Sequence, residues 1–416
     1  MTPTASELLK IVLRCRRNLL RLQQFERVVM AVLTQTSHAT LPGLRGSVAL
    51  GACHPASRVA LQAIALAGAT LVATVARAEI IKKEDMLRGI TVTRDQCAAT
   101  AWTLWLNVDG QDFCVRYYLS TAGGEGMRPV IFLTGDFFGT INAKTWEWIP
   151  IAEDKNANVT FDPADTYRDI NTDDLIKTAD AFSKMAKTTA IYLARIGIGG
   201  TSGNHVFRKT QLELHLMNAA LDAIKQRHGF AGFHLAGQSG GSTLVTSLAA
   251  ERRDIFCAVS GSGRLARSYY NNSTDPARTP VNPLESVLTI AQNRSVRFIM
   301  VTDSADRSVP AKEQTPFAEK MHQAGRDIPQ YLVTATDDYH HDVVGYTELV
   351  TGGCALGKSD AEIARAVGAM VKRNAAYSEQ RRKEIALLAE NGIASQQPSS
   401  DSRPAPEGRT LRRKRL

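Results

Sequence analysis

Short apolar runs alternate with segments of helical periodicity through the middle of the chain. Six runs of five or six residues are dominated by apolar side chains, as expected of strands that are buried on both faces. They are residues 130–134, 190–194, 232–236, 255–260, 297–302 and 330–335. Helical patterning separates several of them, at residues 172–187, 211–227 and 242–251. This alternation predicts an α/β fold with a mostly parallel central sheet and helices on both faces.

Ahead of these runs, residues 101–119 contain two strand-like stretches joined by Asp109-Gly110. Asp-Gly strongly favours a tight β-hairpin, because both residues tolerate the positive φ that the turn requires. We therefore expect an N-terminal antiparallel hairpin at one edge of the sheet.

The chain before the hairpin has a different pattern. Residues 59–75 form an uncharged apolar run that follows Arg58 and precedes an Ala-Arg-Ala triplet ending at Ala78. This arrangement is typical of a secretory signal peptide, so we expect cleavage after Ala78, a secreted or periplasmic protein, and no stable membrane span after processing. About 58 residues precede the run, which a downstream translation start would explain. The alternatives are a short membrane anchor, a buried helix, and an authentic basic amphipathic helix over residues 5–34.

The net charge comes from the two ends of the chain. The 416 residues include 50 Lys and Arg against 41 Asp and Glu, a net charge of +9. Residues 1–78 hold 9 basic and 2 acidic side chains and residues 379–416 hold 9 and 5, so residues 79–378 are nearly neutral. We expect a leader, a single α/β domain, and a helical extension with a disordered basic tail over these three ranges. The neutral middle argues against a nucleic-acid partner.

Six cysteines are present, and four of them follow the predicted cleavage site: Cys97, Cys114, Cys257 and Cys354. An even number in an exported chain permits two disulfides. Cys97 and Cys114 flank the predicted hairpin and are the favoured pair. The spacing of the cysteines and histidines does not match a zinc site, so we expect no metal.

The strongest chemical signal is Gly237-Gln238-Ser239-Gly240-Gly241, between an apolar run and a helical segment. A sharp turn from strand to helix strains the serine backbone and exposes its hydroxyl at the edge of the sheet. The glycines are needed because side chains two residues to either side would collide with the strand and the helix. We therefore expect Ser239 to be a nucleophile; the alternative is an ordinary glycine-rich turn.

A serine hydroxyl needs a base and an acid that orients the base. Asp303 and Asp306 follow the fifth apolar run, and His340 and His341 follow the sixth. Because parallel strands end at the same edge, these candidates are expected near Ser239.

In this order of serine, acid and histidine the chain resembles the α/β-hydrolase family, and within it the catalytic domains of prolyl-oligopeptidase-like and dienelactone-hydrolase-like enzymes. The resemblance covers roughly residues 100–378. In such enzymes the acid commonly stands in Asp-x-x-Val-Pro, which implies Asp306 and leaves Asp303 as the runner-up, a loop-capping residue. The base usually precedes a small and an apolar residue, which favours His341, with His340 as the alternative.

The resemblance also implies two amide donors for an oxyanion. One is Gly240, directly after the nucleophile, and the other lies after the first apolar run, at Asp136 or Phe137. The family often has His-Gly in this loop, whereas this chain has Thr134-Gly135 followed by a carboxylate. Because a carboxylate would repel an oxyanion, we expect the Asp136 side chain to turn away.

Two further loops are candidates for the surroundings of the site. Residues 140–168 carry Trp146 and Trp148, and a loop of this length often forms a lid or a binding wall. We expect these tryptophans to bind substrate, although they would equally serve to pin the loop to the core. Residues 194–205 are rich in glycine but lack a phosphate-loop motif, which favours a tight loop packed beside the site.

The sequence thus predicts an exported serine hydrolase that cleaves a carboxylic ester through an acyl-enzyme intermediate without a cofactor. The alternative is a single-domain serine peptidase of the prolyl-oligopeptidase type, although the sequence has no repeats of propeller length. An alternative of another class is a non-catalytic binding protein with an α/β-hydrolase fold. The expected partner is a small-molecule ester or a short peptide, and the sequence leaves the oligomeric state open.

Overall fold

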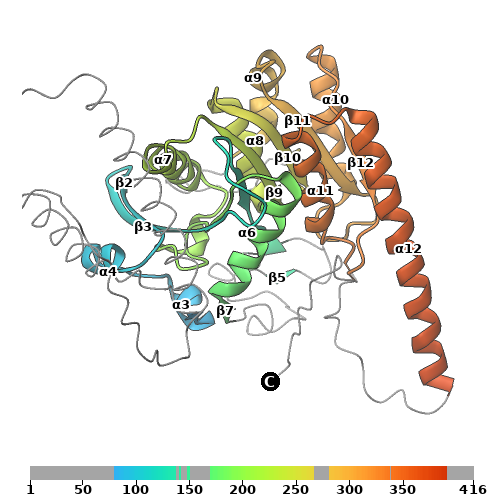
Figure 1. Cartoon of the computed structure of the whole chain (residues 1–416), viewed down its shortest axis with the longest axis horizontal. Coiled ribbons are helices and arrows are strands. Elements are labelled where there is room, and N and C mark those ends of the chain that lie inside the picture. The colour runs from blue at the N-terminus through green and yellow to red at the C-terminus, as the bar shows by residue number, and fades with distance from the viewer. Residues whose placement is uncertain are drawn as a thin grey trace, which may run out of the picture. The chain divides into compact units, whose positions relative to one another are not determined.

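The computed structural model describes residues 79–136, 140–141, 148–149, 169–266, 281–337 and 339–390. At its centre is an eight-stranded sheet with the order β12-β11-β10-β9-β4-β8-β3-β2 (Figure 1). Its strands are β2 (Thr103–Val108), β3 (Gln111–Ser120), β4 (Val130–Leu133), β8 (Ala190–Leu193), β9 (Phe233–Gln238), β10 (Ile255–Gly261), β11 (Arg297–Asp303) and β12 (Gln330–Val333). All neighbours from β8 across to β12 are parallel. The six apolar runs are these parallel strands, and the predicted α/β-hydrolase fold class is confirmed.

The predicted hairpin forms the other edge of the sheet. Strands β2 and β3 pair antiparallel, with Val108 opposite Gln111, and β3 pairs antiparallel with β8. The two turn residues, Asp109 and Gly110, have φ of 50° and 76°. These values suit the tight turn that Asp-Gly predicts.

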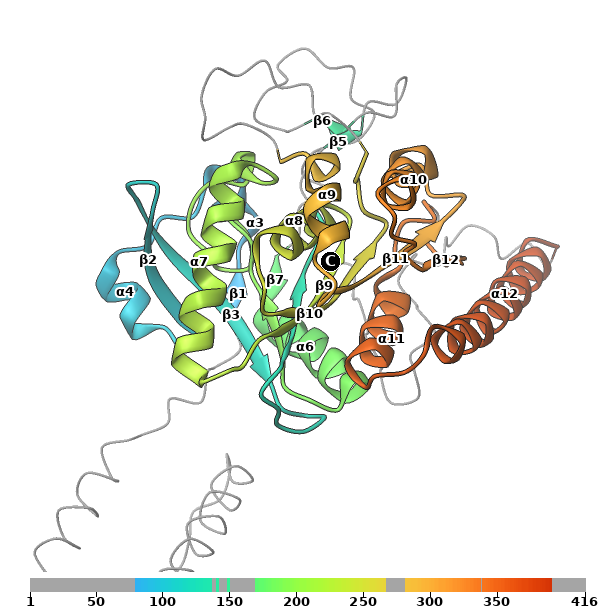
Figure 2. The same cartoon turned by 90° about the horizontal axis from the view of Figure 1, so that it is seen from above.

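Helices cover both faces of the sheet (Figure 2). They are α3 (Lys83–Arg88), α4 (Arg94–Ala99), α6 (Thr172–Ala186), α7 (Gln211–His228), α8 (Gly240–Glu251), α9 (Val287–Gln292), α10 (Thr315–Gln323), α11 (Val344–Ala355) and α12 (Asp360–Glu390). One large apolar cluster joins α7, α8, α9 and α10 to the sheet, and two further clusters join α6, α11 and α12 to it. Burial on both faces explains why the parallel strands are almost wholly apolar.

Two small antiparallel sheets flank this core. Strand β1 (Ile80–Ile81) pairs with β7 (Ile170–Asn171), and β5 (Thr140–Ile141) pairs with β6 (Trp148–Ile149). The predicted leader and the residues beyond 390 lie outside the described residues, so the domain boundaries stay a prediction.

Two disulfides each join a helix to a strand of the central sheet. Cys97 of α4 is bonded to Cys114 of β3, which confirms the predicted pair. The other bond joins Cys257 of β10 to Cys354 of α11. Disulfides are typical of an oxidising compartment. Among the described residues, no helix is both long and apolar enough to cross a membrane.

The parallel strands place several loops at one edge of the sheet. The loops after β4, β8, β9, β11 and β12 all leave the carboxyl ends of their strands, where ligands bind in open α/β sheets. The candidate site therefore lies at this edge.

Candidate active site

Ser239 occupies a sharp turn between β9 and α8. Its φ of 54° and ψ of −120° lie in a region that residues other than glycine rarely adopt. Every other residue from 232 through 250 is buried, whereas Ser239 is half-buried. The turn thus brings one hydroxyl out of an otherwise enclosed strand and helix.

Close packing explains the glycines on either side of this serine. A Cβ at Gly237 would lie 2.6 Å from the amide nitrogen of Ser242, and one at Gly241 would lie 2.1 Å from the carbonyl oxygen of Leu133. Neither position has room for a side chain, as the sequence motif predicts.

His341 contacts the buried carboxylate of Asp306. Its Nδ1 lies 2.9 Å from Oδ2 and 3.1 Å from Oδ1 of Asp306, whose side chain is fully buried. Asp306 Oδ1 also accepts hydrogen bonds from the amides of Ser308 and Val309, at 2.9 and 2.8 Å. With Nδ1 donating to Asp306, Nε2 of His341 is left as the basic nitrogen.

The other two candidates form a second pair. His340 Nδ1 lies 3.2 Å from Asp303 Oδ2, and that oxygen also accepts the amide of Ala335 at 2.7 Å. Asp303 Oδ1 accepts the amide of Ala305 at 2.8 Å. Asp303 therefore caps two loops, the role that sequence analysis gave it as the runner-up.

Hydrogen bonds tie the peptide of His341 to the serine turn. Gln238, directly before Ser239, donates its Nε2 to the carbonyl of His341 at 2.7 Å. Asp337 accepts the amides of His341 and Asp342, at 3.0 and 2.8 Å. The hydrogen bonds of the described residues include none from Ser239 Oγ to either imidazole, and such bonds often tighten only when substrate binds.

The loop after β4 packs against the serine turn on its other side. A Cβ at Gly135 would lie 3.0 Å from the Cβ of Ser239. Gly240 begins α8, and the first amides of a helix have no acceptor within it. The backbone of Asp136 lies in this loop, while the other predicted donor, Phe137, lies outside the described residues.

A buried arginine that sequence analysis did not single out anchors this loop. Arg195 follows β8 and is fully buried. It donates Nη1 to the carbonyl of Thr134 at 3.0 Å and to Oδ1 of Asp136 at 2.7 Å. Its Nε and Nη2 bind the two carboxylate oxygens of Glu213, at 3.0 and 2.7 Å. A charged residue in the glycine-rich loop directly after an apolar run was the available sequence signal.

The Asp136 carboxylate is surrounded by cations. Lys209 forms an ion pair with its Oδ2, and Nη1 of Arg208 lies 3.6 Å from its Oδ1. Burial by itself would raise the pKa of the Asp136 carboxyl, but Lys209, Arg195 and Arg208 hold that pKa well below its usual range. The expectation that the Asp136 side chain turns away is wrong, because a Cβ on Gly240 would lie 2.4 Å from its Oδ2. Its charge is instead held by Lys209, Arg195 and Arg208.

The side chains of the two predicted substrate-binding tryptophans lie outside the described part of the chain. Trp146 lies outside the described residues, and Trp148 is described through its backbone, which pairs with Ile141. Their role stays a prediction. Within the described ranges, no three His, Cys, Asp or Glu side chains are placed to hold a metal ion.

Comparisons with known proteins give likeness in structure only. No family model matches this chain, and no curated protein matches it. Est1E from Butyrivibrio proteoclasticus with bound ferulic acid is 16% identical, with a TM-score of 0.37 over 61% of this chain and 97% of that one. An esterase from Pyrococcus furiosus is 12% identical, with a TM-score of 0.42 over 64% and 93%. An alpha-beta serine hydrolase homologue from Coxiella burnetii is 13% identical, with a TM-score of 0.38 over 61% and 96%. The chain is similar to these proteins in its fold. What its site can do follows from the residues of this chain alone.

Proposed function

We propose that the protein is a serine hydrolase that cleaves carboxylic esters through an acyl-enzyme intermediate. The observation that carries this proposal is the backbone of Ser239, a non-glycine residue at φ 54° whose hydroxyl leaves a fully buried strand and helix. Strained backbone of this kind clusters at active sites. The His341–Asp306 pair follows strands of the same sheet and supplies the base and acid that a serine nucleophile needs.

In the proposed first step, Ser239 Oγ attacks the ester carbonyl while Nε2 of His341 accepts the hydroxyl proton. Asp306 holds Nδ1–H and stabilises the imidazolium that forms. The carbonyl oxygen becomes an oxyanion that accepts hydrogen bonds from the amide of Gly240 and from that of Asp136 or Phe137. Collapse of the intermediate breaks the bond to the alcohol oxygen, which leaves with the proton from His341.

The second step repeats this chemistry with water. Nε2 of His341 accepts a proton from water, the hydroxide adds to the acyl carbonyl, and the bond to Ser239 Oγ breaks as the proton returns to it. The products are a carboxylic acid and the free enzyme. The preference for esters over peptides rests on the absence of propeller-length repeats from the sequence.

A serine-directed fluorophosphonate probe tests the proposal. We expect the wild type to be labelled and Ser239→Ala to lose all labelling while it stays folded by circular dichroism. Ser295→Ala is the matched control, because Ser295 is exposed and lies at the opposite end of the sheet, before β11. Equal labelling of Ser239→Ala and wild type would rule out the nucleophile, and a wild type that neither labels nor hydrolyses short p-nitrophenyl esters would favour a binding protein.

We also propose that the chain is exported after cleavage behind Ala78. The two disulfides among the described residues support an oxidising destination. N-terminal sequencing of the protein purified from its natural source tests this, since a chain that begins at Met1 would contradict cleavage.

A further inference from the structure

Five charged side chains meet beside the serine turn with almost no access to solvent. They are Asp136, Arg195, Arg208, Lys209 and Glu213, and their side chains are 6%, 0%, 4%, 14% and 0% exposed. Burial of ions is costly unless each ion is paired, and a set of apolar side chains would hold a loop at lower cost. A cluster this large beside a nucleophile therefore calls for a reason other than stability.

The pairing within the cluster separates it into two parts. Glu213 takes two hydrogen bonds from one edge of Arg195 and accepts the amide of Lys209 at 2.5 Å. Asp136 accepts a hydrogen bond from Nη1 of Arg195 and forms an ion pair with the ammonium of Lys209. Of the two carboxylates, Asp136 is the one that lies on the loop facing the nucleophile.

The Asp136 carboxylate also packs against Gly240, directly after the nucleophile. A Cβ placed on Gly240 would lie 2.4 to 2.5 Å from the carboxylate atoms of Asp136, so this group fills the space above Gly240. In the proposed mechanism the amide of Gly240 faces a growing negative charge. A carboxylate at this position would oppose that charge unless cations neutralise it.

We propose that Lys209 and Arg195 are positioning residues that act through Asp136. They hold its loop against the serine turn and neutralise its carboxylate, so that the oxyanion does not form beside an uncompensated negative charge. This inference rests on the proposed serine hydrolase activity.

The test compares variants that change the charge of the cluster with variants that preserve it. Lys209→Met removes a cation and leaves the Asp136 carboxylate in place, so we expect kcat for p-nitrophenyl acetate to fall by about tenfold while KM changes by less than about twofold. Lys209→Arg and the double variant Asp136→Asn/Lys209→Met keep the net charge. We expect Lys209→Arg to keep kcat within about threefold of wild type, and the double variant to be at least about threefold faster than Lys209→Met.

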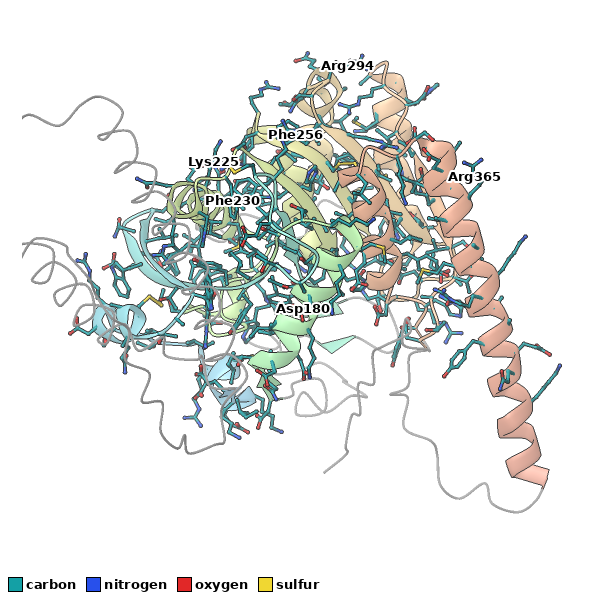
Figure 3. All side chains as sticks on the ribbon, viewed as in Figure 1. Asp180, Lys225, Phe230, Phe256, Arg294 and Arg365 are labelled. Atoms are coloured by element: carbon teal, nitrogen blue, oxygen red, sulfur yellow. A yellow bond between two sulfur atoms is a disulfide. The ribbon has the colours of Figure 1, made fainter. Side chains whose placement is uncertain are left out.

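A matched control is available at the far end of α7, the helix that follows Lys209. Lys225, labelled in Figure 3, lies in the last turn of α7 and pairs with Asp254 at 2.7 Å. Asp254 directly precedes β10, at the opposite edge of the sheet from the serine turn. Lys225→Met removes a partly buried lysine from an ion pair in the same way, and we expect it to leave kcat unchanged. Melting temperatures of all variants show whether each is folded.

The outcomes distinguish this inference from the proposed function. A wild type without Ser239-dependent turnover would defeat the proposed function, and this inference with it. An active wild type with an equally active Lys209→Met, or a double variant no faster than Lys209→Met, would defeat this inference alone. If Lys209→Met does not fold, Lys209→Arg decides, because it keeps both the ion pair and the charge, and a loss of more than about tenfold in this variant contradicts the inference.

Discussion

His341–Asp306 and His340–Asp303 are two neighbouring histidine–carboxylate pairs. The histidines lie in the loop after β12 and the aspartates at the end of β11 and just beyond it, but the two carboxylates make different hydrogen bonds. In Asp306, the backbone amides bind Oδ1, and Oδ2 is left to His341 at 2.9 Å. In Asp303, backbone amides bind both oxygens, and His340 shares Oδ2 with the amide of Ala335 at a longer 3.2 Å. Asp306 is thus able to orient an imidazole, whereas Asp303 mainly joins loops.

The backbone accounts for how consecutive histidines reach different carboxylates. His340 has a φ of 55°, in the left-handed region, and this turns the chain between the two side chains. The peptide of His341 is then fixed by Gln238 and Asp337, one of which adjoins the nucleophile. The two histidines therefore differ because each binds a different carboxylate and because only the His341 peptide is held next to the nucleophile.

Replacing each histidine by alanine gives the largest expected contrast. We expect His341→Ala to lower kcat for short p-nitrophenyl esters by at least about 10³-fold, because it removes the base, and His340→Ala to lower it by less than about tenfold. Initial rates, with melting temperatures as the check on folding, measure the difference. If only His340→Ala abolishes turnover, the roles of the two pairs are reversed.

The carboxylates give a smaller contrast of the same kind. Asp306→Asn should lower kcat by roughly 10²- to 10⁴-fold with little change in stability, since an amide cannot stabilise the imidazolium. Asp303→Asn should instead lower the free energy of unfolding by about 1–3 kcal/mol, because its Nδ2 would face a backbone donor, and should reduce kcat far less.

Ester hydrolysis rates and urea unfolding of the two asparagine variants measure this. A large loss of kcat in Asp303→Asn, in a protein as stable as wild type, would show that both pairs take part in the chemistry.

The sequence was sufficient for the parts of the site that depend on local pattern. The parallel strands, the turn at Ser239 and the placement of the acid and histidine loops follow from apolar runs and glycines close together in the chain. The φ of His340 has no such signal, because the residue is not a glycine and its conformation depends on the hydrogen bonds around it. The partners of Arg195 were equally hidden, since Asp136 and Glu213 lie 59 and 18 residues away in the chain.

A buried histidine outside the two pairs makes the stability of the protein depend on pH, and this limits the pH range in which the two pairs can be compared. His234 is buried in β9, and its Nδ1 has no hydrogen-bond partner among the described residues. Burial, together with the charge of Arg128, lowers the pKa of His234 to about 4. Between its ordinary pKa near 6.5 and about 4, the unfolded chain binds a proton that the folded protein does not. The stability should therefore fall as the pH is lowered through this window.

His234→Gln isolates this contribution to stability. Because one titrating group is removed, the free energy of unfolding of the variant should fall by about 1.4 kcal/mol less per pH unit than that of wild type near pH 5. Urea unfolding from pH 4.5 to 8 measures both slopes, and above pH 7 the two curves should run parallel. Identical slopes near pH 5 would mean that His234 is protonated in the folded protein. His205, whose pKa burial also lowers to about 4, would still contribute to acid unfolding, so the activities of the two pairs are best compared above pH 7.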